Sequence, residues 1–300
     1  MRSPAPLPVQ LATAAGFTIA DAAALEVGRQ RLRRSDLVRI FHGVHATRMP
    51  TTSTERAAAY LPRLRPGQVF SHATAAGLLG MPIPQRLLDG PLHVAAVYPA
   101  QAPRTEGVAP HRLLARPGLL DEHVGYPVTG EYETWCSLAP VLSLPELVAM
   151  GDHLVRKGVR DPLPVLDELE ATMRVVRRVG IDRLERAFRL LRPGVRSAME
   201  SVLRVLIVLG GLPEPEVNRR IYGRSGRFLG EGDLVYRVQR PLLEYEGDGH
   251  RTDKAQFRKD ITRREDFEDD GWGVLRITAD DVFLHRRQLL QRIARRLGLT

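Results

Sequence analysis

The chain has 300 residues, 43% of them hydrophobic and 26% charged, with a net charge of +9. This length predicts two or three domains, each able to bury a sizeable core. No apolar run reaches the ~18 residues of a membrane span, and the start "MRSPAPLPVQLATAAGF" is too Pro-interrupted for a secretory signal, so a cytoplasmic protein is expected. The single cysteine, Cys136, excludes internal disulfides and Cys-based zinc sites, and we expect a buried thiol.

The positive charge is weak evidence for a polyanionic partner. Of the 44 basic residues only Lys157, Lys254 and Lys259 are lysines. Such an arginine excess is typical of GC-rich genomes, with or without nucleic-acid binding. The charge therefore favours a nucleic-acid partner only modestly.

The first ten residues are Pro-rich and are expected to be disordered, and residues 11–50 predict a winged helix-turn-helix. Thr18 can cap a helix to about Glu26, with Asp21 completing a capping box. A second short helix is predicted in "RQRLRRSDL", followed by a strand with a glycine turn in "VRIFHGVHA". A small helical domain with a basic surface helix is the alternative. In the DNA-binding interpretation, a recognition helix carries Arg29, Gln30, Arg33 and Arg34.

Residues 51–158 predict a mixed α+β middle region, and residues 159–192 a helical linker. "GPLHVAAVYP" is typical of a buried strand, and "EHVGYPVTG" of short strands with a turn. The histidines of this region lack metal-ligand spacing and are expected to be structural or exposed. They are His72, His93, His111 and His123.

Residues 193–300 predict the order α-β-β-α-β-α. A helix follows Pro193-Gly194, a hairpin turns near residue 240, and a charged helix precedes the strand "WGVLRIT". Trp272, at the start of that strand, should be at least partly buried.

An acidic cluster in "PLLEYEGDGHR" follows the apolar part of the hairpin. Glu244 and Glu246 alternate along a strand and so share a face. A turn centred near residue 240 places Asp233 about opposite Glu246, and Val235 opposite Glu244. Carboxylates this close retain a proton unless a cation neutralises them. Mg²⁺, which takes one or two carboxylates and keeps several waters, suits such a site. A solvated acidic edge strand is the alternative.

The blocks "SAMESVLRVLIVLGGLPEPEVNRR", "GEGDLVYRVQRPLLEYEGDGHR" and "FRKDITRREDFEDDGWGVLRIT" resemble the domain-of-unknown-function 559 family. That family is related to very-short-patch-repair endonucleases of the PD-(D/E)XK superfamily. The resemblance covers about residues 195–298. It implies a restriction-endonuclease-like mixed sheet flanked by helices, and DNA cleavage that depends on Mg²⁺ or Mn²⁺.

The same resemblance assigns roles to particular residues. It implies that Asp233 and Glu244 are the principal metal ligands, and that Glu200 is an outer ligand or positions water. Glu246 stands where the superfamily usually has lysine, which puts catalytic competence in question, although a carboxylate there can also bind metal. His250 matches a family histidine that acts as a general acid–base or contacts the scissile phosphate; a surface histidine in a turn is the alternative.

Further basic residues match the family pattern. Asp260 and Arg263 lie at i, i+3 and predict a salt bridge, although Arg263 or Arg264 could reach a phosphate. Arg276 is either a phosphate contact or a partner for an acidic residue. For Glu200, an exposed salt-bridge ladder with Arg196 and Arg204 is the competing account.

The stretch "GFTIADAAALEVGRQRLRRSDLVRIFHGVHA" resembles the winged helix-turn-helix of AbiEi-type antitoxins. This implies DNA binding and, by association, a cognate toxin or defence protein as a further partner. The combined expectation is an α+β or α/β multidomain DNA endonuclease of DNA repair or phage defence, without a membrane partner. The alternative is an inactive nuclease fold that acts as an antitoxin-like transcriptional repressor. The sequence does not indicate the oligomeric state.

Overall fold

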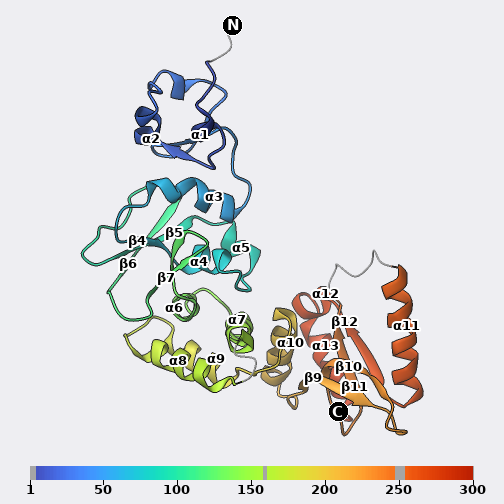
Figure 1. The fold of residues 1–300 in the computed structure, drawn as a ribbon. Helices are drawn as coiled ribbons and strands as arrows, with labels where there is room; N and C mark the ends of the chain where they lie inside the picture. The colour runs from blue at the N-terminus through green and yellow to red at the C-terminus, as the bar shows by residue number, and fades with distance from the viewer. Residues whose placement is uncertain (1–4, 158–160, 247–253, 300) are drawn as a thin grey trace. The chain divides into compact units, whose positions relative to one another are not determined.

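The computed structural model describes residues 5–157, 161–246 and 254–299. Within these ranges it describes the side chains of all residues except 157 and 254–261. The chain is mixed α+β, with three sheets (Figure 1). It divides into two compact units. The first unit comprises Met1–Val141 and Glu168–Ile181, and the second comprises Leu142–Asp167 and Asp182–Thr300, so the expected 159–192 linker contributes to both. No helix in the described ranges is long and apolar enough to cross a membrane.

The first unit begins with a small sheet of order β1-β3-β2 and its own apolar cluster. The predicted capping box is confirmed, since the Thr18 side chain accepts a hydrogen bond from the Asp21 amide and Asp21 accepts one in return. The glycine turn between strands is also present, at Gly43 with φ +77°. The elements are α1 (Val9–Ala12), β1 (Phe17–Thr18), α2 (Ile19–Ala24), η1 (Arg31–Arg33), β2 (Val38–Phe41) and β3 (Val44–Ala46).

Two expectations for this segment are wrong. Residues 9 and 10 were expected to be disordered, but they begin helix α1, because Leu11 anchors this helix in the apolar cluster. The second helix does not form: only η1, a single 3₁₀ turn, is present, and Arg34 is extended. Arg31 donates to both carboxylate oxygens of Asp36, at 2.9 and 2.6 Å, which fixes a turn where a helix would continue.

A five-stranded sheet of order β6-β5-β4-β8-β7 forms the rest of the first unit. The predicted buried strand is confirmed as β5. The expected burial of the Cys136 thiol is confirmed as well, and this burial raises its pKa to about 12. The further elements are α3 (Ser53–Tyr60), η2 (Leu61–Arg63), β4 (Gln68–Phe70), α4 (His72–Leu78), α5 (Gln85–Leu88), β5 (Leu92–Val97), β6 (Val108–Leu113), β7 (Leu120–His123), β8 (Tyr126–Thr129) and α6 (Glu131–Ser137), while α8 (Leu163–Arg174) spans residues of both units.

The second unit contains a four-stranded sheet of order β12-β11-β10-β9. Strands β9, β10 and β11 are antiparallel neighbours, whereas β12 runs parallel to β11. Its elements are α7 (Leu144–Lys157), α9 (Ile181–Arg189), α10 (Ala198–Leu209), β9 (Glu216–Tyr222), β10 (Phe228–Val235), β11 (Pro241–Tyr245), α11 (Lys254–Asp269), β12 (Gly273–Ile277), α12 (Ala279–Phe283) and α13 (Arg286–Arg296).

The predicted order of this unit lacks one strand. Residues Glu216–Tyr222 form the edge strand β9. Its side chains are mostly polar and partly exposed, so the sequence lacks the apolar alternation by which a strand is predicted. The predicted hairpin register is also wrong: Val235 pairs with Leu242, and Leu234 with Leu243. The chain therefore turns about one residue earlier than the Pro241-based turn suggested, and Asp233 comes next to Glu244.

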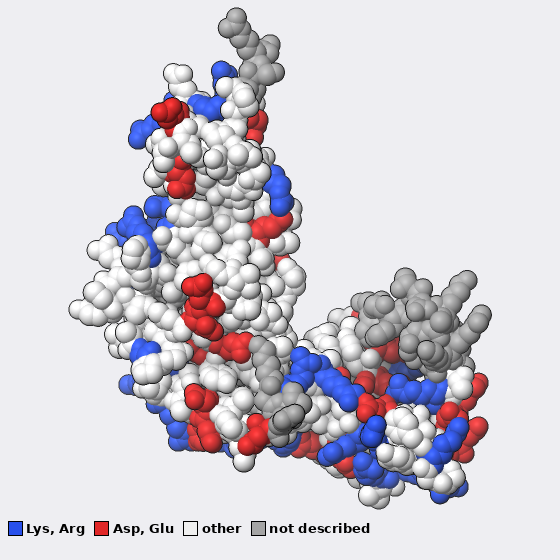
Figure 2. All heavy atoms as spheres, viewed as in Figure 1, with Lys and Arg blue, Asp and Glu red and all other residues white. Residues whose placement is uncertain are grey.

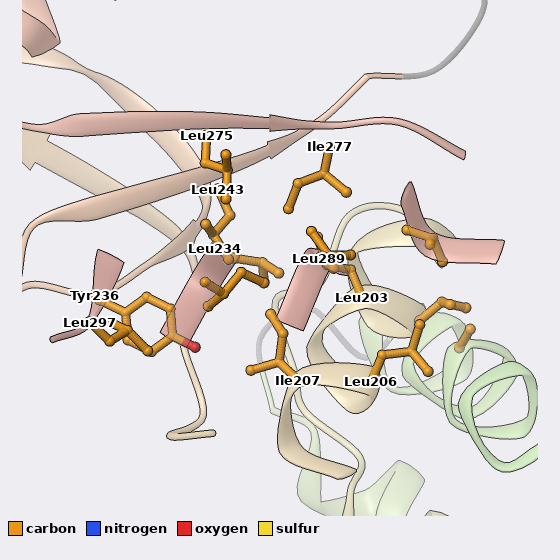
Figure 3. Packing of buried hydrophobic residues seen from close by; sticks show 14 residues of the cluster. Leu203, Leu206, Ile207, Leu234, Tyr236, Leu243, Leu275, Ile277, Leu289 and Leu297 are labelled. Carbon is orange, nitrogen blue, oxygen red and sulfur yellow. The ribbon is translucent and has the colours of Figure 1, made fainter. Parts of the chain in front are cut away.

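Each face of the sheet packs on different helices (Figure 1). On one face, Leu203 and Ile207 of α10 pack with Leu243 and Ile277 and with Leu289 of α13 (Figure 3). On the other face, Val235 and Leu242 pack with Phe267 of α11 and with Trp272. The predicted burial of Trp272 is confirmed, at 7% exposed. The sheet is thus held between two apolar layers, which fixes the direction in which its polar side chains point.

A buried ion pair links α10 to α7. Arg204 is fully buried and donates to Asp152 at 3.0 Å and to Glu214 at 2.7 Å. Ser201 and the Arg192 backbone amide also donate to Asp152, each at 2.7 Å. The ladder of exposed salt bridges considered for Glu200 is therefore wrong, because Arg204 points into the protein.

We expect Arg204→Met to lower the free energy of unfolding of the second unit by about 3–5 kcal/mol, because the buried Asp152 carboxylate would lose its charged partner. Urea-induced unfolding measures this loss. Arg237→Ala is the matched control: it removes an exposed pair with Glu216 in the same unit and should cost about 1 kcal/mol or less. Equal losses in the two variants would contradict this account of Arg204.

Candidate functional site

Strand β10 carries Asp233 between two neighbouring strands. The glycine before it is required by packing, since a Cβ on Gly232 would lie 2.1 Å from a methyl carbon of Leu242. Asp233 lies near α11, since the charge of Arg263 acts on it together with the charges of Glu200 and Glu244. The side chain is half-buried there. A carboxylate is thus placed well inside the sheet and close to α11.

Glu244 of β11 lies beside Asp233. The register Leu234–Leu243 continues to this pair, and the backbone amide of Tyr245 donates a hydrogen bond to Asp233 Oδ2 at 3.1 Å. Leu242 belongs to the α11 face, so Glu244 points to that face, where Arg263 of α11 binds it. The structure therefore brings together the two residues expected to be the principal ligands, in a register different from the predicted one.

Glu200 joins this centre from the first turn of α10. The helix is capped by Ser197, whose hydroxyl accepts from the Glu200 amide at 3.2 Å. The Glu200 carboxylate is only 6% exposed and accepts hydrogen bonds from the Arg196 amide at 3.0 Å and from Asn218 Nδ2 at 2.6 Å. Glu200 is thus a positioned, buried carboxylate rather than a surface residue.

Asn218 is a site residue that the sequence analysis missed. It lies on β9, in the pairing gap opposite Asp233 between Gly232–Arg219 and Leu234–Val217. Its φ is +47°, a left-handed conformation that asparagine tolerates better than most residues. Its amide nitrogen also donates to the Gly194 carbonyl at 3.0 Å. In the sequence, the only indication of this role is an asparagine within a polar stretch, which does not distinguish a site residue from an ordinary surface residue.

The electrostatics of the centre show in the pKa of Asp233, which is raised to about 6. Burial is the largest cause, and the charges of Glu200 and Glu244 add to it. The hydrogen bond from Tyr245 and the charge of Arg263 act in the opposite direction. Asp233 therefore lies where a negative charge is costly and where an additional cation would be stabilising.

Two arginines neutralise part of the acidic cluster. Arg263 of α11 donates to Glu244 Oε1 at 2.5 Å and to the Glu231 carbonyl at 2.5 Å. Arg276 of β12 pairs with Glu246 Oε1 at 2.8 Å. Of the two roles considered for Arg276, the structure shows the partner of an acidic residue. For Arg263 it shows a pair with Glu244, while the side chain of the expected partner Asp260 lies outside the described part of the chain.

Glu246 does not join the centre. Glu246 is exposed, and its carboxylate turns to Arg276. His250 lies outside the described residues. In the parts of the chain that are described, the carboxylates do not form a group of three with all ligand atoms within 4.8 Å. The centre therefore consists of the neighbouring carboxylates Asp233 and Glu244, with Glu200 held by Asn218.

Charged side chains are interleaved on the visible face of the second unit (Figure 2). In the first unit, the residues expected to contact DNA are all exposed, but they lie in and beside the single turn η1 instead of lining a helix. These residues are Arg29, Gln30, Arg33 and Arg34.

A second group of metal-ligating side chains lies in the first unit. His72, His93 and His111 each offer a ligand atom, and these atoms all lie within 4.8 Å of one another. These histidines are 18 to 39 positions apart, so their spacing in the sequence does not indicate a shared site. His123, the fourth histidine of that region, is not part of this group.

We expect Asp233→Asn to stabilise the protein above about pH 6 and to have little effect below about pH 4. The unfolded chain ionises Asp233 near its ordinary pKa of 3.8, whereas the folded chain retains the proton to about pH 6. Stability therefore falls as the pH rises through this interval, by about 1–3 kcal/mol, and the uncharged asparagine avoids that loss. Chemical denaturation at several pH values measures it.

Asp281→Asn is the control of opposite sign. Although partial burial raises the pKa of Asp281, hydrogen bonds from Thr278 and the nearby Arg292 lower it overall. Its charge therefore stabilises the fold above its ordinary pKa, and Asp281→Asn should destabilise the protein at neutral pH. An Asp233→Asn variant that is also less stable at pH 8 would contradict the account of a strained carboxylate.

Comparison with known proteins identifies relatives over most of the chain. The chain is 27% identical over 267 residues to uncharacterized protein MT2308 of Mycobacterium tuberculosis strain CDC 1551 / Oshkosh. It matches uncharacterized protein Rv2248 of strain ATCC 25618 / H37Rv equally well. The aligned region covers 89% of this chain and 94% of each relative, so the similarity extends over both units. No family model and no solved structure matches the chain.

Proposed function

We propose that the protein is a metal-dependent DNA endonuclease that acts in the cytoplasm. The observation that carries the proposal is the half-buried pair Asp233 and Glu244, backed by the buried Glu200. Burial, with the charges of Glu200 and Glu244, raises the pKa of Asp233 to about 6. Perturbed carboxylates of this kind are typical of functional sites. The resemblance to the domain-of-unknown-function 559 family and to PD-(D/E)XK nucleases names these same residues.

Asp233 and Glu244 would hold the cation, Mg²⁺ or Mn²⁺, since both prefer carboxylate oxygens. When bound, the cation would supply an activated water and offset charge on the phosphate. Asn218 keeps the Glu200 carboxylate turned toward this centre, through a bond of 2.6 Å. Glu200 would position the attacking water rather than bind the cation directly, because its Oε2 already accepts two hydrogen bonds.

Arg263 would change partner when the cation binds. It now neutralises Glu244 at 2.5 Å. A cation on Glu244 would displace the guanidinium, and the displaced group could then contact a DNA phosphate, for which its planar fork is suited. Arg263 would thus couple occupation of the acidic centre to the binding of the substrate backbone.

DNA binding by the first unit is part of the proposal. The exposed residues Arg29, Gln30, Arg33 and Arg34 lie in the same segment as the three-stranded sheet β1-β3-β2, and the net charge of +9 favours a polyanion. Because η1 is too short to read several base pairs, these residues would contact mainly the phosphate backbone. A cognate toxin or defence protein would be a further partner.

One observation favours a second function, that of an inactive DNA-binding repressor of the antitoxin type. Glu246 stands where the resembled superfamily usually has lysine, and it is paired with Arg276 at 2.8 Å. The lysine that would orient the attacking water is therefore replaced by an ion pair. In this function the acidic centre would be a relic and DNA binding would remain.

Plasmid nicking separates the two functions. With Mg²⁺ or Mn²⁺ we expect cleavage by the wild type and a rate at least about 100-fold lower for Asp233→Asn, since a metal ion's charge stabilisation is worth several kcal/mol. Asp280→Asn, an exposed carboxylate of α12 in the same unit, is the matched control and should cleave like the wild type.

The outcomes of this assay are distinct. Cleavage that is equally fast in Asp233→Asn would overturn the proposed site. Absence of cleavage by the wild type with both metals, on plain, mismatched and single-stranded DNA, together with intact DNA binding, would favour the repressor. DNA binding is measured in parallel by a gel shift at two salt concentrations, because phosphate contacts weaken as the salt concentration rises.

A further inference from the structure

The fold of the first unit places His72, His93 and His111 together. His93 lies on β5 and His111 on β6, and the parallel register pairs His93 with Ala109 and Ala95 with His111. Alternate residues of a strand share a face, so both histidines point the same way. The start of α4 is tied to them, because the Ser71 amide donates to the His93 carbonyl at 3.0 Å. His72 follows directly as the first residue of α4.

The three imidazole rings are in contact. His93 Nδ1 lies 2.9 Å from His111 Nε2. The rings of His72 and His111 are stacked with centroids 3.7 Å apart, and the other two ring pairs lie at 5.2 and 5.5 Å. One nitrogen of each histidine lies within 4.8 Å of those of the other two. A single small ion could therefore reach all three.

His72 adopts a backbone conformation that is unfavourable for a residue with a side chain. Its φ is +49°, in the left-handed region that costs a non-glycine residue about 1 kcal/mol. Backbone strain of this kind concentrates where function requires a particular side-chain position. Here the strained conformation carries the imidazole over the rings of His93 and His111, and its Nδ1 lies 3.1 Å from Ser71 Oγ.

The surroundings keep these rings uncharged. Burial, together with the neighbouring His111, lowers the pKa of His72 to about 3 and that of His93 to about 4. Neutral imidazoles retain the lone pairs that bind metals. The three side chains are nevertheless only half-buried, which leaves an ion access from solvent.

We propose that His72, His93 and His111 form a binding site for a transition-metal dication of the zinc class. Imidazole nitrogens suit Zn²⁺, whereas Mg²⁺ prefers oxygen ligands. Three histidines leave the fourth tetrahedral position to water. A nitrogen lone pair lies in the plane of its ring, so the stacked rings rotate about the Cβ–Cγ bond to converge on the ion. That torsion is soft in histidine.

The bound ion would join α4 to β5 and β6 and so stabilise the first unit. It is separate from the proposed Mg²⁺ centre in ligand type and in the unit that holds it. The inference therefore does not depend on nuclease activity.

The test is a titration of the full chain with Zn²⁺ by calorimetry, and with Co²⁺ by visible absorption, in an Asp233→Asn background that weakens the acidic centre. We expect one equivalent to bind, with the Co²⁺ spectrum of a tetrahedral site, and Zn²⁺ to raise Tm. His111→Ala should weaken binding by more than about 100-fold, since loss of a group that merely orients a ligand already costs ~10–100-fold. His123→Ala, a histidine of the same unit outside the group, should bind like the parent.

His72→Gly guards against a folding artefact. Glycine accepts φ +49° without strain, so this variant should fold at least as stably as the metal-free parent while losing the site. Its Tm should then not respond to Zn²⁺. The proposal is overturned if the parent shows no saturable one-to-one binding, or if His72→Gly and His111→Ala bind as tightly as the parent.

Discussion

The second unit is organised around the cost of holding the Asp233 carboxylate inside a sheet between other acids. Its strand lies between β9 and β11, so the backbone that carries this charge is paired on both sides. Two contacts limit that cost: the Tyr245 amide donates to Asp233, and Arg263 neutralises Glu244. The fold therefore tolerates a strained charge at this point, a pattern common where function outweighs stability.

The frame that tolerates this strain is stabilised elsewhere. Apolar layers on both faces of the sheet fix the positions of β10 and β11, and the buried pair of Arg204 and Asp152 fixes α10, the helix that carries Glu200. Arg204 lies one turn after Glu200 but points to α7 and not to the acidic centre. One helix thus supplies a structural ion pair and a site carboxylate from adjacent turns.

Local patterns predicted local structure well and long-range pairing poorly. The capping box of Thr18, the buried strand β5 and the burial of Trp272 were each signalled by a short stretch of sequence, and all three are confirmed. Strand β9 was missed because an edge strand needs no apolar alternation. The acidic pair could be proposed from spacing, but its register, Asn218 and the three-histidine group depend on strand pairing that no spacing in the sequence reveals.

The central claim is that Asp233 and Glu244 together bind a divalent cation. A crystal structure of the protein grown with Mn²⁺, with anomalous scattering recorded, tests it most directly. The account predicts an anomalous peak within about 2.0–2.6 Å of oxygens of both carboxylates, typical of hard-cation coordination, with Arg263 displaced from Glu244. The absence of a peak there, with Arg263 still bonded to Glu244 at millimolar Mn²⁺, would contradict it.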